Sequence, residues 1–241
     1  MKKYILRWVV LILGLLVTLS LFFFFKTRKQ YRVCQNFKVT YRHGQTPLQT
    51  TAEIQTYLEK DTIKFLGTSV SQVDLSKIEH ALESNPFIQS SDCYFDMNGT
   101  LRMELTQKTP ILRVIPNQLT AYYLDENGRR FPLSTLYSPK VKVATGFIPN
   151  ALNTKLYTFI SYVNQSEFWN HFIEQIFVRP NGDIIFTTKV GGFEVVVGGV
   201  DRLEQKLDKL KRFLLLASPN QGWEEYREIN LKFKDQVICK K

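Results

Sequence analysis

The sequence predicts an α+β protein with a single N-terminal transmembrane helix, a small β-α-α-β-β domain, and a mostly antiparallel β domain containing two or more helices. Three observations lead to this prediction. Residues 8–25 form an uncharged apolar run, two amphipathic helical stretches and a hairpin pattern fill 33–109, and short alternating segments separated by turn residues fill 110–241. A chain of 241 residues is long enough for two small domains, each with its own core.

The positive charge of the chain is concentrated at its N-terminus. The formal net charge is +10, and residues 1–32 contribute seven of these charges because they contain no acidic residue. Residues 33–241 contain 25 basic and 22 acidic residues and are therefore nearly neutral. A basic nucleic-acid-binding surface needs its charge on the folded part, so this distribution argues against nucleic acid as a partner.

The apolar run at 8–25 predicts a membrane anchor. As a helix it would be about 27 Å long, close to the thickness of the hydrocarbon core of a bilayer. A cleaved signal peptide is the alternative, but its apolar region is usually about 7–15 residues long and ends in small residues, whereas this run ends in four phenylalanines. We therefore expect a retained anchor with residues 1–7 as a short tail and 26–32 as a basic linker. Three basic residues before the run and four after it leave its orientation open.

The first domain is predicted from helical periodicity and turn signals. Val33–Tyr41 alternates as a strand, and Thr51–Lys60 forms an amphipathic helix. Asp74 is a good N-cap for a second helix, which Asn85-Pro86 ends. A hairpin over 87–107 then turns at Asn98-Gly99.

The second domain is predicted to be rich in short strands. They are expected at 111–115, 121–124, 140–145, 173–178, 183–188, 193–197, 228–233 and 237–239. One helix is expected over 152–168, and Asp201 is expected to cap another that reaches about residue 217. The glycine pairs at 191–192 and 198–199 flank a strand, so they indicate two turns rather than a phosphate-binding loop.

No residue pattern predicts catalysis, a cofactor or a metal. The histidines are scattered, and none has a partner at metal-ligand spacing (His43, His80 and His171). The three cysteines are expected to be small buried or half-buried thiols (Cys34, Cys93 and Cys239), with a Cys34–Cys93 disulfide as the alternative if the domain lies outside the cytoplasm. We therefore predict no catalytic, cofactor-binding or metal-binding residue, and expect a binding protein.

The C-terminal strand is the most promising binding surface. A chain end placed in a sheet often lies at an edge, where unpaired backbone groups can bind a partner strand. Leu231 and Phe233 could then supply side-chain specificity. The alternative is an internal strand whose apolar face fills the core, and the sequence leaves both possibilities open.

Several local motifs, taken in order, resemble the FtsQ/DivIB family of bacterial cell-division proteins over nearly the whole chain. They are Asn85-Pro86-Phe87-Ile88, Leu101–Glu104 with Gln107–Ile111, Tyr123–Gly128, Gly192–Gly198 with Glu204–Leu207, and Ile229-Asn230-Leu231-Lys232-Phe233. Asn230 stands where the family pattern usually has Asp. The resemblance implies a POTRA domain over 33–109 followed by the family's β domain over 110–241.

The resemblance also implies a function without catalysis. The protein would be a single-pass scaffold of the divisome in the cell inner membrane, with its N-terminus in the cytoplasm, its bulk in the periplasm, and a concentration at the division septum. Its POTRA domain would contact other divisome proteins, and its β domain would bind FtsB and FtsL by strand addition at the C-terminal edge. No cofactor, nucleic acid or small-molecule substrate is implied.

By motif, the resemblance places partner binding on five residues, Ile229, Asn230, Leu231, Lys232 and Phe233. Phe233 would be the apolar anchor and Lys232 an electrostatic contact. Two other functions remain as alternatives. One is a POTRA-containing factor for envelope protein assembly or transport, and the other is a membrane-bound enzyme.

Overall fold

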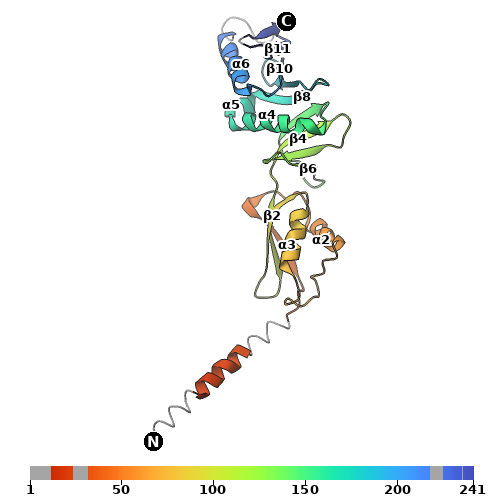
Figure 1. Ribbon diagram of the computed structural model, residues 1–241, viewed down its shortest axis with the longest axis vertical. Helices are drawn as coiled ribbons and strands as arrows, with labels where there is room; N and C mark the ends of the chain where they lie inside the picture. The colour runs from red at the N-terminus through yellow and green to blue at the C-terminus, as the bar shows by residue number, and fades with distance from the viewer. Residues whose placement is uncertain (1–11, 24–31, 218–224, 235) are drawn as a thin grey trace. The chain divides into compact units, whose positions relative to one another are not determined.

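The computed structural model describes residues 12–23, 32–217, 225–234 and 236–241 (Figure 1). The chain divides into two compact units, Met1–Gln107 and Lys108–Lys241. Residues 12–23 are helical, while the rest of the predicted 8–25 anchor, the tail at 1–7 and nearly all of the linker at 26–32 lie outside the described residues. Among the helices that are described, none is both long and apolar enough to cross a membrane.

The first unit contains a three-stranded sheet with the order β1-β3-β2. Its strands are β1 (Phe37–Tyr41), β2 (Ile88–Phe95) and β3 (Leu101–Gln107), and a short 3-10 helix, η1 (Arg42–Gly44), follows β1. The strand β3 lies in the centre, parallel to β1 and antiparallel to β2. The predicted strand began at Val33, but that residue forms only an isolated bridge with Ser69, so the prediction started too early.

Two helices pack on this sheet, as the β-α-α-β-β pattern predicted (Figure 1). The helix α2 (Thr51–Lys60) has the predicted bounds and begins with a capping box. The helix α3 (Leu75–Ser84) begins where Asp74 accepts a hydrogen bond from the Lys77 N–H, and it ends before Asn85-Pro86. Their apolar faces join the sheet in one core (Ile54, Leu58, Ile78, Leu82, Leu101, Met103 and Leu105).

The cysteines are free thiols. Cys34 and Cys93 are buried in the core of the first unit, and Cys239 is half-buried, so the prediction of buried or half-buried thiols is confirmed. The alternative of a Cys34–Cys93 disulfide is not what the structure contains. Burial, and then the nearby carboxylates of Glu79 and Asp92, together raise the pKa of Cys93 to about 12.

The second unit contains one large sheet. Its described strands run in the order β12-β11-β10-β9-β8-β7-β4-β5-β6. Their bounds are β4 (Pro110–Pro116), β5 (Tyr122–Asp125), β6 (Arg130–Pro132), β7 (Lys142–Gly146), β8 (Ile173–Val178), β9 (Ile184–Thr188), β10 (Glu194–Gly198), β11 (Glu228–Asn230) and β12 (Ile238–Lys240). Five of the eight pairings between these described strands are antiparallel, and β4–β7, β7–β8 and β10–β11 are parallel.

The helix expected over 152–168 is confirmed over residues 153–165, but it ends at Gln165 rather than continuing to 168. A 3-10 turn, η2 (Asn150–Leu152), leads into α4 (Asn153–Gln165), and α5 (Glu167–Phe172) follows. The break falls at Ser166, whose backbone is extended and whose hydroxyl accepts a hydrogen bond from the Trp169 N–H. A serine in this conformation ends one helix and caps the next.

The helix α6 (Leu203–Ala217) covers part of the sheet next to β10 and β11 (Figure 1). Its predicted apolar stripe is confirmed, since all four leucines are buried in the core of the second unit (Leu203, Leu207, Leu210 and Leu214). The carboxylate of Asp201, expected to cap this helix, accepts a hydrogen bond from the Lys206 ammonium at 3.3 Å.

Candidate binding site at the C-terminal edge

The C-terminal segment contributes both an internal strand and the last strand of the described sheet. The strand β11 pairs in parallel with β10, where Ile229 lies beside Val195, and antiparallel with β12, where Ile229 lies beside Cys239. Residues 228–230 are therefore internal, and the terminal strand is β12 at 238–240. The expectation that residues 229–233 themselves line the edge is corrected accordingly.

The predicted six-residue strand at 228–233 ends after three residues because the chain turns at Asn230. The side-chain oxygen of Asn230 accepts a hydrogen bond from the Lys232 N–H at 3.0 Å, which is the geometry of an Asx turn. The Leu231 N–H still donates to the Val196 carbonyl at 2.9 Å, so the chain leaves β10 only beyond that residue. Alternation is lost at this bend.

The bend separates the apolar residues of the segment into two groups. Ile229 and Leu231 are fully buried in the core of the second unit. Phe233, which strict alternation would place on the same side, is instead 50% exposed. An exposed aromatic ring in the segment that leads to the terminal strand is the kind of side chain that anchors a partner at an interface.

Lys232 lies on the other side of the bend and is held by the strands beneath it. Its ammonium is 2.8 Å from an Asp183 carboxylate oxygen. Its stem packs over Gly198, where a Cβ atom would lie only 2.8 Å from Lys232 Cγ and where φ is +75°. Burial raises the pKa of Asp183, but the hydrogen bonds from Lys232 and Asn181 outweigh it, so the pKa is lowered overall.

The terminal strand β12 is fastened to the sheet by charged groups. The Lys240 ammonium lies 2.7 Å from a carboxylate oxygen of Glu228, whose other oxygen lies 3.2 Å from the Arg179 guanidinium. The hydrogen bond from Lys240 and then that from Arg179 lower the pKa of Glu228. The Arg227 N–H also donates to the Lys240 carbonyl at 2.9 Å. These contacts hold a strand that has only three paired residues.

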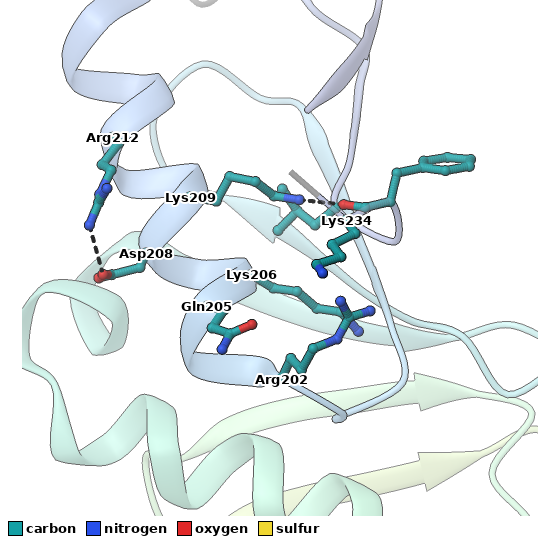
Figure 2. Close-up of a pocket in the computed structure, with 9 residues that line it drawn as sticks. Arg202, Gln205, Lys206, Asp208, Lys209, Arg212 and Lys234 are labelled. Carbon is teal, nitrogen blue, oxygen red and sulfur yellow. Dashed lines mark hydrogen bonds and ion pairs between the residues drawn. The ribbon is translucent and has the colours of Figure 1, made fainter. Parts of the chain in front are cut away.

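A groove of about 620 Å³ lies between α6 and residues 231–234 (Figure 2). Its lining contains five cationic side chains and one carboxylate (Arg202, Gln205, Lys206, Asp208, Lys209, Arg212, Leu231, Phe233 and Lys234). Five of these residues lie on α6, Arg202 directly precedes the helix, and Lys234 faces them from the C-terminal segment (Figure 2). The groove is therefore positively charged and has an aromatic residue in its lining.

This basic groove was not predicted from the sequence. The signal was present, because Lys206, Lys209 and Arg212 recur at three-residue spacing and run from the flank of the leucine stripe to the opposite face of the same helix. Their meeting with Phe233 depends on the packing of α6 beside β11, which periodicity cannot give. Across residues 12–23, 32–217, 225–234 and 236–241, no three His, Cys, Asp or Glu side chains gather closely enough to hold a metal ion.

Together these elements can bind a peptide. The end of a sheet offers backbone hydrogen-bonding groups, an exposed ring offers apolar contact, and a basic groove attracts acidic side chains.

Two family models match the chain, FtsQ/DivIB C-terminal related over residues 109–240 and POTRA-like domain over residues 32–106. A search of curated proteins finds no match. The first match covers more than half of the chain and contains the whole C-terminal edge.

Proposed function

Because the chain belongs to the FtsQ/DivIB family, a family of non-catalytic cell-division scaffolds, we propose that it binds FtsB and FtsL through its C-terminal edge. In this proposal residues 8–25 anchor the protein in the cell inner membrane, with the N-terminus in the cytoplasm. The POTRA-like domain and the β domain lie in the periplasm at the division septum. The POTRA-like domain contacts other divisome proteins, and the β domain links them to FtsB and FtsL.

The observation that carries this proposal is the exposed Phe233, which lines the basic groove and lies in the segment that leads to the terminal strand β12. A segment of the partner would add a strand next to β12 and cover the Phe233 ring. Acidic residues of the same segment would then be attracted to the groove along α6. This arrangement supports protein binding without any catalytic group.

The five residues expected from the resemblance have different roles in the proposed site. Phe233 is the anchor that the partner covers. Ile229 and Leu231 support the edge from the core, and Asn230 makes the turn that turns Phe233 outward. Lys232 is paired with Asp183 and therefore holds the bend. It would contact the bound partner only if an acidic group of that partner replaced Asp183 at its ammonium.

The test is the affinity of the full-length chain, in lipid nanodiscs, for the periplasmic segments of FtsB and FtsL. We expect Phe233→Ala to weaken binding by about 30-fold or more, since truncating an anchor of this kind costs about 2 kcal/mol or more. Phe177→Ala is the matched control, because Phe177 is an exposed phenylalanine, 42% accessible, on β8. Unchanged affinity in Phe233→Ala would overturn the proposed edge.

The cellular part of the proposal has its own test. A fluorescent fusion of the full chain is expected to form a band at midcell in dividing bacteria. A uniform envelope signal would contradict the division role and favour a POTRA-containing assembly or transport factor. Combining the fusion with Phe233→Glu then asks whether FtsB and FtsL still reach the band.

A further inference from the structure

One lysine of α6 holds the connection between β11 and β12. The ammonium of Lys209 lies 2.6 Å from the Phe233 carbonyl oxygen and 2.7 Å from the Gln236 carbonyl oxygen. Figure 2 shows Lys209 reaching from the helix across the groove, with the bond to the Phe233 carbonyl drawn as a dashed line. A single side chain therefore joins two backbone groups that lie three residues apart.

These two hydrogen bonds are expected to be stronger than hydrogen bonds between neutral groups. A charged donor makes hydrogen bonds to carbonyl groups about twice as strong as a neutral donor does. The Lys209 residue as a whole is half-buried, although both hydrogen bonds are exposed to solvent. One helical turn earlier, Lys206 donates to the Gly199 carbonyl at 2.8 Å in the same manner, so α6 fastens two connections of the sheet.

The terminal strand needs such support. Only Ile238–Lys240 pair with β11, and a pairing of three residues is marginal by itself. The Phe233 backbone carries one of the two clamped carbonyls, so the direction of its exposed ring follows from the position of the connection. If the β11–β12 connection were mobile, the Phe233 ring and β12 would adopt many arrangements. Ordering them on binding would then lower the affinity for a partner.

We propose that Lys209 is a positioning residue for partner binding, which fixes the β11–β12 connection so that Phe233 and β12 are presented in one arrangement. This inference rests on the proposed function of the edge. It differs from a simple charge effect, because what matters is the pair of hydrogen bonds rather than the positive charge of the groove.

The first experiment measures the clamp without any partner. Hydrogen exchange of the full-length chain in nanodiscs is compared between the wild type and Lys209→Met. We expect exchange of the amides of residues 231–234 and 236–240 to rise by about tenfold in the variant, while amides of β8 and β9 stay unchanged. Arg212→Met is the matched control, since Arg212 lines the same groove and lies 3.7 Å from Asp208. Unchanged exchange in Lys209→Met would overturn the proposal.

The second experiment measures affinity for the FtsB segment in the same variants. Lys209→Met is expected to weaken binding more than Arg212→Met, and Lys209→Arg to recover much of the loss because a guanidinium can donate to two carbonyls. Equal losses in the two methionine variants would show a charge effect alone and overturn the proposed positioning role of Lys209.

If Lys209→Met unfolds the unit in a thermal melt, the exchange and affinity of Lys209→Arg and Lys209→Gln decide instead. If the wild type binds neither partner segment, the proposed function fails, and the exchange result still decides whether Lys209 holds the connection.

Discussion

The two units treat a sheet edge in opposite ways. In the first unit, β2 is an edge strand whose outward amides are bonded to carboxylates of α3. Glu79 accepts from the Cys93 N–H at 2.8 Å, and Glu83 accepts from the Ser91 N–H at 3.4 Å. In the second unit, the contacts seen at the terminal strand run inward, from Lys240 to Glu228 and from Lys209 to the connection before the strand.

This difference has a consequence for binding. An exposed edge is a site for unwanted pairing, and proteins commonly cover it with charged side chains. The α3 carboxylates occupy donors that an added strand on β2 would need. The inward contacts of β12 keep the strand in place and leave its outer side to a partner. Under the proposed strand addition, this difference favours β12 over β2 as the strand that a partner would pair with.

The largest expected effect is a difference in stability between substitutions of a buried and of an exposed residue in the C-terminal segment. Leu231→Ala is expected to lower the free energy of unfolding of the second unit by about 2–4 kcal/mol, because the side chain is fully buried. Phe233→Ala, with half of its surface exposed, is expected to cost about 1 kcal/mol or less. Denaturant unfolding of the full-length variants measures both values. Equal losses would mean that Phe233 supports the core rather than the surface.

The next expected effect concerns the covered edge of the first unit. Glu79→Ala removes the acceptor of the buried Cys93 N–H, which is expected to cost about 1–2 kcal/mol and to speed exchange of that amide. Glu79→Gln keeps an oxygen at the same place and is expected to restore most of the loss. His80→Ala, at an exposed position on α3, is the matched control. A Cys93 amide that stays protected in Glu79→Ala would show that the edge is closed by something else.

Much of the first unit could be predicted because its signals are local. The capping residue Asp74 and the stop at Asn85-Pro86 are read within one or two turns of helix. The break at Ser166 was missed, although Trp169 and Phe172 of α5 fall out of phase with the apolar stripe of α4, so the change of periodicity marks the interruption. The strand β6 was missed because three residues are too few for a pattern.

The candidate site was only partly predictable, because some of its signals are local and others depend on contacts between distant parts of the sequence. Residues 229–233 were identified by motif, and Asn230 carries a local signal for the turn that exposes Phe233. Residues 229–233 do not form the terminal strand, because β12 pairs with β11 on its outer side. The apolar alternation of residues 229–233 does not indicate which strand lies at the end of the sheet. The contacts of Lys209 join residues 24 and 27 positions apart, so no window of sequence contains them.

The smallest expected effect tests the inward fastening of β12 by pH. The folded-state pKa of Glu228 is lowered from 4.5, first by the Lys240 hydrogen bond and then, against some burial, by Arg179. A carboxylate with a lowered pKa contributes stability that is fully present above its unfolded pKa and is lost as the pH falls through the folded pKa. Glu228→Gln is therefore expected to be less stable than the wild type by about 1 kcal/mol near neutral pH.

The stability difference between Glu228→Gln and the wild type is expected to shrink as the pH falls below about 4.5, because the wild-type carboxyl then becomes neutral too. Denaturant unfolding at a series of pH values measures it. Glu225→Gln is the matched control, since Glu225 pairs with Lys241 next to the strand but its side chain is 48% exposed against 15% for Glu228. Water screens the more exposed pair, so its substitution is expected to change stability little at any pH. A difference for Glu228→Gln that stays constant with pH would show that its packing, rather than its charge, holds β12 against β11.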